Sequence, residues 1–403
     1  MNANGFADSG PVDLLLCCLS ARADSLQSQK VQQSTADDWH EVVDLAARAS
    51  LAPLLFKRLK ECDARARVPA DAWEQLRLAY FRSAHTNASG YHRLRPVLRR
   101  LRNSGIPVIA LKGAFLAESV YGDIALRPMC DFDLMVPRAQ LTRTRLILLD
   151  MGFAPQEGEE VETRRSKHIP PLADSNLIVE IHWTIATPSG PVRADTAGLW
   201  NRARPSSVAG VDVLTLSPED FLLHLCVHFG CQHGLGIPKA VCDISETIRR
   251  FRSEIDWSQV ANRARQWHAP KYVGLTLHLA VGMLGTEVPN SILERLVPGG
   301  IDQRLFDAAK EAVLTGTSVR EAAPFGDELR QARERIFLSR DEMAKRYPAS
   351  RESRHLYPYY ALRLRDAGRS FGSRIAKQSL ALVRSRERGG ISALVKWLRP
   401  ARP

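Results

Sequence analysis

The residues best suited to chemistry are two aspartates, Asp131 and Asp133, in the segment 131–136. This segment alternates polar and apolar residues, then becomes wholly apolar before Pro137, which predicts a strand with one polar end. Residues two apart on a strand face the same side, so both carboxylates should leave one face. Two carboxylates there repel each other unless a cation lies between them, and Mg²⁺ prefers such oxygen ligands. The spacing predicts a metal site; the alternative is a solvated strand end.

A third acid, Glu180, lies in the middle of a second predicted strand, 176–183. Its neighbours are apolar, and an acid inside an apolar strand is costly to bury without a partner. Three acids on two strands of one small sheet could hold two metal ions, an arrangement that serves phosphoryl or nucleotidyl transfer. The alternative is that Glu180 pairs with an arginine. His182 shares a face with Glu180 and is a further candidate for the site.

The dipeptide Lys112-Gly113 follows a short β-prone run, 106–111, and opens a predicted helix. A glycine at that position lets a phosphate approach the backbone, and a helix N-terminus favours an anion. Lys112 would add a positive charge next to the phosphates, and Arg127, four residues before Asp131, would do the same. The alternative is a turn glycine beside a surface lysine.

The elements around these residues change character along the chain. Apolar residues recur at helical spacing over residues 38–104, whereas residues 105–185 alternate predicted strands and helices. After residue 185 we expect helices to return, with a clear helix start at the cap Ser217-Pro218. The expected class is α+β, a small mixed sheet flanked by helical regions. The expected divisions are an N-terminal helical region (1–104), an α/β core (105–216), a helical domain (217–349) and a basic, amphipathic helical tail (350–403).

Charge and cysteine usage narrow the classes of protein further. The net charge is +12, but residues 361–403 alone hold eleven Arg and Lys against Asp366 and Glu387, a net charge of +9. The basic character therefore belongs to one segment, which we expect either to bind an anionic membrane or RNA, or to pack on its own protein. The seven cysteines include no C-x-x-C pair. No apolar run is long enough to cross a membrane, and no basic leader precedes the N-terminal apolar run.

Several histidines are weaker candidates. His224 and His228 are four residues apart on one predicted helix, and His233 and Asp243 follow. They could contact a nucleotide or a metal, but histidines on a helix more often serve packing. His168 precedes Glu180 in the chain and could face an acceptor or simply lie on the surface.

The segment from Leu111-Lys112-Gly113 through Tyr121 and Arg127 to Asp131-x-Asp133 resembles the uncharacterised bacterial nucleotidyltransferase family of the polymerase-β-like superfamily. The resemblance covers roughly residues 35–270. It implies that the metal ligands and catalytic residues are Asp131, Asp133 and Glu180, and that Lys112, Gly113, Arg127 and His182 bind the nucleotide. The chain departs from the superfamily in one place, since Lys-Gly-Ala replaces the usual Gly-Ser after the first strand.

Our interpretation is a Mg²⁺-dependent nucleotidyltransferase, with Mn²⁺ as the alternative ion. It would transfer a nucleoside monophosphate from a nucleoside triphosphate to an unidentified acceptor, which is a small molecule, saccharide, peptide or RNA, and release pyrophosphate. The alternatives are a non-catalytic binding module with the same fold and a phosphotransferase acting on RNA or protein. The expected location is the cytoplasm, at the inner face of the membrane if the basic tail binds lipid.

Overall fold

The computed structural model describes residues 10–20, 29–62, 64–156, 166–175, 177–319 and 389–398, with residues 343, 347, 355, 358–360 and 362. The chain divides into two compact units, residues 1–233 with 237–302 and residues 234–236 with 303–403. Every residue predicted for the site belongs to the first unit. The expected boundaries at 104/105 and 216/217 also fall inside it, and most of the expected tail, 350–403, lies outside the described residues.

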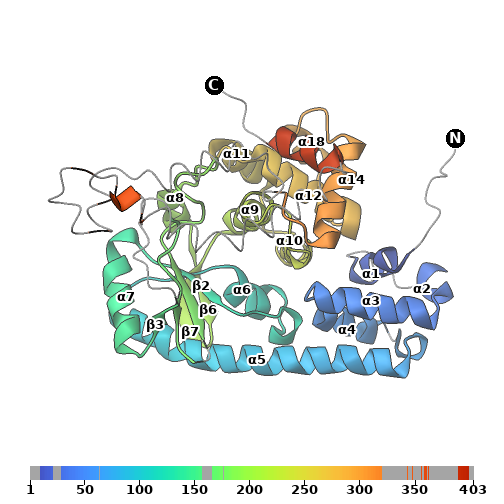
Figure 1. Ribbon diagram of the computed structural model, residues 1–403, viewed down its shortest axis with the longest axis horizontal. Helices are drawn as coiled ribbons and strands as arrows, with labels where there is room; N and C mark the ends of the chain where they lie inside the picture. Colours follow the sequence, from blue (N-terminus) through green and yellow to red (C-terminus); the bar gives the residue numbers. More distant parts are fainter. Residues whose placement is uncertain are drawn as a thin grey trace. The chain divides into compact units, whose positions relative to one another are not determined.

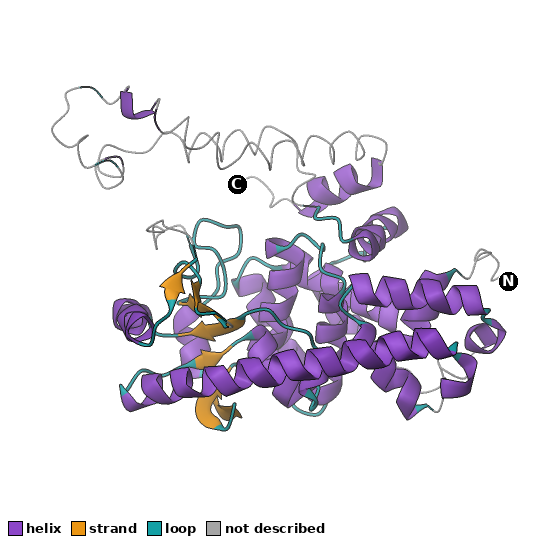
Figure 2. Ribbon diagram, turned by 60° about the horizontal axis from the view of Figure 1, so that its bottom comes forward, coloured by secondary structure: helices purple, strands orange, loops and turns teal. Residues whose placement is uncertain are grey.

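The first unit combines many helices with one sheet (Figures 1 and 2), which confirms the α+β class. Its α-helices are α1 (Pro11–Leu19), α2 (Gln29–Gln33), α3 (Ala36–Arg48), α4 (Ala52–Glu61), α5 (Ala70–Asn103), α6 (Lys112–Phe115), α7 (Leu141–Asp150), α8 (Thr196–Asn201), α9 (Pro218–Val227), α10 (Lys239–Arg250), α11 (Trp257–Gln266), α12 (Pro270–Leu284) and α13 (Asn290–Leu296). Its strands are β1 (Ile109–Ala110), β2 (Phe132–Met135), β3 (Ala154–Pro155), β4 (Leu172–Ala173), β5 (Ile178–His182), β6 (Arg204–Val208) and β7 (Val211–Thr215).

The helical pattern predicted for residues 38–104 is confirmed by α3, α4 and α5. Helix α3 begins with a capping box, in which Thr35 and Asp38 each bond the other's backbone N–H, and it buries Trp39 and Val42. Helix α5 has 34 residues, which makes it about 50 Å long. It runs along α3 and α4 and continues past the sheet, where it contacts β7 and α7 (Figures 1 and 2). One helix thus connects the N-terminal helices to the sheet that carries the site.

The sheet is mixed, with the strand order β3-β4-β5-β2-β1-β7-β6. Strand β2 lies at its centre, parallel to β5 on one side and antiparallel to β1 on the other. Strand β1 is shorter than the predicted run 106–111 and has only two residues. Since β2 is buried along its whole length, any polar side chain on it must find its partners inside the protein.

Helices return after residue 185 as expected, but two strands that the sequence pattern did not predict lie among them. Strands β6 and β7 form a hairpin whose two turn residues, Ala209 and Gly210, both have positive φ angles, +54° and +68°. Two left-handed residues match a type I′ turn, which suits the twist of paired strands. The usual Asn-Gly or Asp-Gly signal is absent, because Ala209 occupies the first turn position. The hairpin completes the sheet, since β7 lies parallel to β1.

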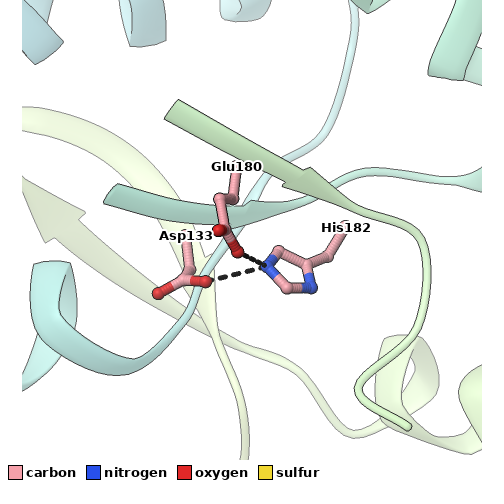
Figure 3. Close-up of side chains that lie close together, drawn as sticks. All are labelled: Asp133, Glu180 and His182. Atoms are coloured by element: carbon pink, nitrogen blue, oxygen red, sulfur yellow. Dashed lines mark hydrogen bonds and ion pairs between the residues drawn. The ribbon is translucent and has the colours of Figure 1, made fainter. Parts of the chain in front are cut away.

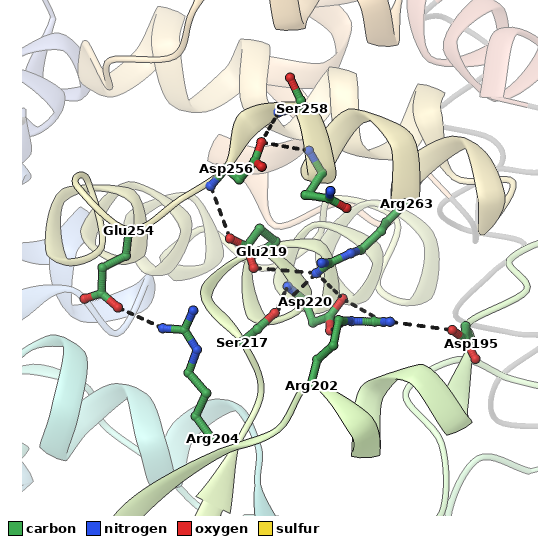
Figure 4. Close-up of polar contacts among 11 residues, drawn as sticks. Asp195, Arg202, Arg204, Ser217, Glu219, Asp220, Glu254, Asp256, Ser258 and Arg263 are labelled. Carbon is green, nitrogen blue, oxygen red and sulfur yellow. Dashed lines mark hydrogen bonds and ion pairs between the residues drawn. The ribbon is translucent and has the colours of Figure 1, made fainter.

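Helix α9 is anchored at its N-terminus by a buried network of charges (Figure 4). Ser217 caps the helix by accepting the backbone N–H of Asp220. The Asp220 side chain is fully buried and accepts hydrogen bonds from Arg202 (2.7 Å) and Arg263 (3.1 Å). Arg263, on α11, also lies 3.5 Å from Glu219. These paired charges join α8, α9 and α11, and so hold in place the helix that carries His224.

In the second unit, α14 (Gln303–Thr315) packs against α18 (Gly389–Leu398), a helix of the basic tail. The apolar residues Ile391, Leu394, Val395 and Leu398 of α18 are buried. A side chain added at Gly390 would lie 3.1 Å from the Cβ of Ala308 on α14. In this segment the packing alternative is therefore observed. No helix among the described residues is both long and apolar enough to cross a membrane.

We expect Leu394→Ala to lower the free energy of unfolding of the second unit by about 2–5 kcal/mol, because it leaves a cavity between α18 and α14. Hydrogen exchange of the amides of residues 389–398 in the intact chain measures this. Ser392→Ala, at an exposed position of the same helix, is the control and should change exchange little. Equally fast exchange in the wild type and in Leu394→Ala would show that α18 does not pack in solution.

Candidate functional site

The centre of the site is built by the parallel pairing of β2 with β5. The register places Asp133 beside Glu180 and Met135 beside His182. As a result the side chains of Asp133, Glu180 and His182 converge on one face of the sheet (Figure 3), with one potential ligand atom from each lying within 4.8 Å of the others. The chain thus brings together two carboxylates and an imidazole from strands that are separated by more than forty residues.

Asp133 is almost fully buried, and two donors share one of its oxygens. Lys112 Nζ lies 2.5 Å from Asp133 Oδ1, and His182 Nε2 lies 2.8 Å from the same atom. Burial alone would raise the pKa of Asp133, but the charge of Lys112 and the hydrogen bond from His182 outweigh it and hold the pKa well below its usual range. Asp133 is therefore a carboxylate at neutral pH, available as a ligand.

Glu180 is the second carboxylate of this group, and its Oε2 lies 3.3 Å from His182 Nε2. The hydrogen bond from His182 lowers the pKa of Glu180 despite partial burial and the nearby charge of Asp133. His182 itself has no exposed surface, and its Nδ1 has no hydrogen-bond partner among the described residues. One imidazole N–H therefore spans the two acids, in the position where a cation would neutralise them.

Asp131 lies just before β2 and outside this three-residue group. Burial and then the charge of Asp133 raise its pKa above the ordinary aspartate value, with Glu180 adding to the effect and Lys112 opposing it. The structure therefore makes Asp131 an electrostatic neighbour of Asp133 and Glu180. A carboxylate with a raised pKa beside two others gains most when a cation enters.

The donor set fits a divalent cation. Carboxylate oxygens are the ligands that Mg²⁺ and Mn²⁺ take, whereas an imidazole nitrogen suits transition metals. Asp133 and Glu180 are the ligands common to both choices. The buried Nδ1 of His182 has no hydrogen-bond partner among the described residues, so the hydrogen bonds of this ring are incomplete.

Lys112 is the first residue of α6 and has a strained backbone conformation. Its φ angle is +37°, a left-handed conformation that costs energy for a residue other than glycine. The start of this helix is tied to β2 by a 3.0 Å hydrogen bond from the Leu111 N–H to the carbonyl oxygen of Asp133. Strain of this kind persists only where the surroundings determine the conformation. Here it lets the lysine reach the buried Asp133.

Gly113 leaves space that two side chains occupy. A Cβ atom at this position would lie 2.7 Å from Arg127 Nη1 and 2.7 Å from Met129 Sδ. The close approach expected of a phosphate is thus made by the Arg127 guanidinium, so the absent side chain brings the two predicted nucleotide-binding segments together.

Arg127 is paired with an acid that did not enter the predicted site. Its Nε and Nη2 donate to both oxygens of Asp243, on α10, at 3.0–3.2 Å. Asp243 also accepts the hydroxyl of Tyr121 at 3.0 Å. Burial opposes the charge on Arg127, but Asp243 outweighs it and raises the arginine pKa. The sequence carried one signal for this pair, an aspartate on a predicted helix after the histidines.

A second residue of α10, Lys239, was missed altogether. Its Nζ donates to the carbonyl oxygen of Pro128 at 3.0 Å, in the segment that leads from Arg127 to Asp131. Burial, then the charge of Arg127, lowers the pKa of Lys239, whereas Asp243 and Asp131 act in the opposite direction. Only the spacing of four residues between Lys239 and Asp243, one helical turn, could have linked it to the site.

The histidines form two neighbouring groups. The ring of His168 lies 5.1 Å from that of His182, beside β5. His228 and His233 bring their Nε2 atoms to 3.1 Å across a π-helical turn, and the His224 ring lies 6.0 Å from that of His228. His224 is fully buried, and neither of its ring nitrogens has a partner among the described residues. Burial, then Lys112 and Lys167, hold its pKa well below the usual value, so the ring is neutral.

We expect Asp131→Asn and Asp133→Asn to change stability in opposite directions when metal is chelated. Asp133 has a depressed pKa, so its carboxylate stabilises the fold above pH ~4. This stabilisation is lost as the pH falls through the folded-state pKa. Asp133→Asn also leaves the buried charge of Lys112 unpaired, so we expect a loss of about 3 kcal/mol at pH 7.

Asp131 has a raised pKa, so its ionised form costs stability at neutral pH and that cost disappears on acidification. Asp131→Asn should therefore melt at the wild-type temperature or above it at pH 7, with the difference vanishing below pH ~4. Thermal unfolding with EDTA measures both variants. If Asp133→Asn were the more stable of the two, the pairing with Lys112 would not exist in solution.

Comparison with known proteins places this site in a family. A family described as an uncharacterised nucleotidyltransferase matches residues 35–285. No curated protein matches the chain. Among solved structures, the antibiotic-resistance factor ANT(2'')-Ia is similar over 48% of this chain and 97% of its own, with 13% sequence identity and a TM-score of 0.34. The family match spans more than half of the chain and includes the acids, Lys112, Arg127 and α10, and the chain belongs to this uncharacterised nucleotidyltransferase family.

Proposed function

We propose that the chain transfers a nucleoside monophosphate from a nucleoside triphosphate to an acceptor in a reaction that depends on Mg²⁺ or Mn²⁺. The observation that supports this most is the pairing of Asp133 with Glu180 across β2 and β5, with Lys112 and His182 on the same carboxylate oxygen. Family membership supports nucleotidyl transfer as the reaction class. The proposal further specifies a nucleoside triphosphate as the donor, Mg²⁺ or Mn²⁺ as the ion, and pyrophosphate as the leaving group.

Asp133 and Glu180 would hold the cation, with Asp131 beside them. The cation would neutralise the phosphates and polarise the α-phosphorus for attack. Lys112 lies 2.5 Å from Asp133 and so places a positive charge where triphosphate oxygens would approach this acid. An acceptor oxygen would form a bond with the α-phosphorus as the bond from that phosphorus to the α,β-bridging oxygen breaks; pyrophosphate would leave, and the proton of the acceptor hydroxyl would pass to water. Positioning and charge neutralisation would supply most of the rate.

The acceptor is proposed only by class, as a small molecule, saccharide, peptide or RNA with a nucleophilic oxygen. A reaction that consumes nucleoside triphosphates is proposed for the cytoplasm, where these are abundant. Contact of the basic tail with an anionic membrane or RNA stays a proposal, and in α18 it would use exposed cations such as Lys396, because the apolar face is packed.

The reaction class is tested by incubating the protein with each α-labelled nucleoside triphosphate, Mg²⁺ or Mn²⁺ and a cell extract. We expect one component of the extract to become labelled and pyrophosphate to appear in equal amount. Asp131→Asn and Asp133→Asn should abolish transfer, because amides hold the cation poorly. Glu180→Gln should also lose most of the activity.

Asp150→Asn is the matched control, since that carboxylate is 71% exposed on α7. Full transfer by the Asp131/Asp133 double variant would refute the metal role of these acids. Transfer of the γ-phosphate in place of the α-phosphate would identify a phosphotransferase, and binding without transfer would identify a binding module.

We expect the substitutions Lys112→Met and Arg127→Met each to weaken triphosphate binding. Loss of a charge-assisted contact costs about 1.5–3 kcal/mol, roughly a ten- to hundredfold rise in Kd. The nucleoside without phosphates should lose less, because these residues recognise charge. Calorimetry with the triphosphate and the nucleoside compares the two effects for each variant. Equal losses for both ligands would place Lys112 and Arg127 away from the phosphates.

A further inference from the structure

Helix α10 forms two polar contacts with the segment just before Asp131. Lys239 and Asp243 lie one turn apart on this helix, and both contact residues just before Asp131. Asp243 binds the Arg127 side chain, and Lys239 binds the carbonyl oxygen of Pro128. Both partners are more than a hundred residues away in the chain, so α10 forms a wall of the site that the motif around Asp131 does not contain.

The charges at this wall are not balanced. Asp243 is 5% exposed, and the bidentate contact commits it to Arg127, whose side chain is 12% exposed. The two charges cancel. Among the described residues, Lys239 forms no ion pair, and its Nζ has a neutral carbonyl as its hydrogen-bond partner. Burial, and then the nearby charge of Arg127, lowers the pKa of Lys239, in agreement with the absence of a carboxylate partner in the described part of the chain.

A partly buried cation without a counter-ion is costly, and an anion that enters beside it recovers that cost. Its hydrogen-bond partner, the carbonyl oxygen of Pro128, lies three residues before Asp131, so an anion bound at Lys239 would lie beside the segment that leads into the proposed metal acids. A phosphate chain meets both requirements, because its oxygens bind a metal ion on one side and an ammonium group on the other.

We propose that Lys239 binds the phosphate chain of the nucleotide and is a further substrate-binding residue of this site. The proposal rests on the proposed function. It adds to the sequence motif: Arg127 shares its charge with Asp243, whereas Lys239 has no carboxylate partner among the described residues. The polyphosphate is recognised by charge, so the base makes no difference to this contact.

The test uses inorganic tripolyphosphate with Mg²⁺ as a probe that lacks a base, together with the four nucleoside triphosphates and their nucleosides. Calorimetry compares the wild type with Lys239→Met, Lys112→Met and Lys60→Met. Lys60 is exposed on α4, so its variant removes the same charge far from the acids. We expect Lys239→Met to weaken tripolyphosphate and triphosphate binding by about tenfold or more. For the nucleosides, the Kd of Lys239→Met should differ from that of the wild type by less than twofold. Lys60→Met should change the Kd for every ligand by less than twofold.

Two further measurements separate binding from folding. Lys239→Met should unfold at the wild-type temperature or above it without ligand, because it removes an uncompensated charge. If Lys239 had a purely structural role, the same substitution would lower the melting temperature. Lys239→Arg should retain most of the tripolyphosphate affinity, because the charge remains.

The outcomes distinguish this inference from the proposed function. If Lys112→Met weakens tripolyphosphate binding and Lys239→Met does not, the role of Lys239 is wrong and the proposed function stands. If the wild type binds neither tripolyphosphate nor any nucleoside triphosphate, the proposed function fails. A lowered melting temperature for Lys239→Met with unchanged affinity would make Lys239 a structural residue.

Discussion

The structure depends on the burial of one carboxylate, Asp133, at the centre of a mixed sheet. A buried charge is tolerated only when partners surround it, and here Lys112 and His182 both reach the same oxygen. To bring Lys112 there, the chain accepts a left-handed residue after β1. To bring His182 there, β5 must pair with β2 in parallel and in one register. A shift of β5 by one residue would turn Glu180 and His182 to the opposite face of the sheet.

The charges around this carboxylate form two groups of paired side chains. Lys112 and His182 compensate Asp133 directly, whereas Arg127 and Asp243 compensate each other at the side of the site. Asp131, with a raised pKa, and Lys239, with a lowered one, are the charges that remain poorly matched. Unmatched charges of opposite sign suit a ligand that carries both signs, and a metal-bound polyphosphate is such a ligand. On the proposed function, binding of such a ligand would compensate both charges.

Part of this arrangement could be predicted from local sequence. The D-x-D spacing and an acid within an apolar strand led to Asp131, Asp133 and Glu180, because strand periodicity determines which side chains share a face. The same periodicity linked His182 to Glu180, and the structure places both beside Asp133. The contacts of Arg127 could not be predicted, because its partner Asp243 lies 116 residues further along the chain. The β6–β7 hairpin was missed because Ala209 occupies a turn position where asparagine or aspartate would have been the signal.

We propose above all that Asp133 and Glu180, with Asp131 beside them, hold a divalent cation that binds the phosphates of a nucleotide. This proposal is tested most directly by a crystal structure with Mn²⁺ and a nucleoside triphosphate analogue whose α,β-bridging oxygen is replaced by methylene. Anomalous scattering locates the ion independently of the model of the protein. We expect a manganese peak in contact with Asp133 and Glu180 and with the phosphates of the analogue. An analogue bound elsewhere, with no manganese at these acids and Lys112 still bound to Asp133, would contradict it.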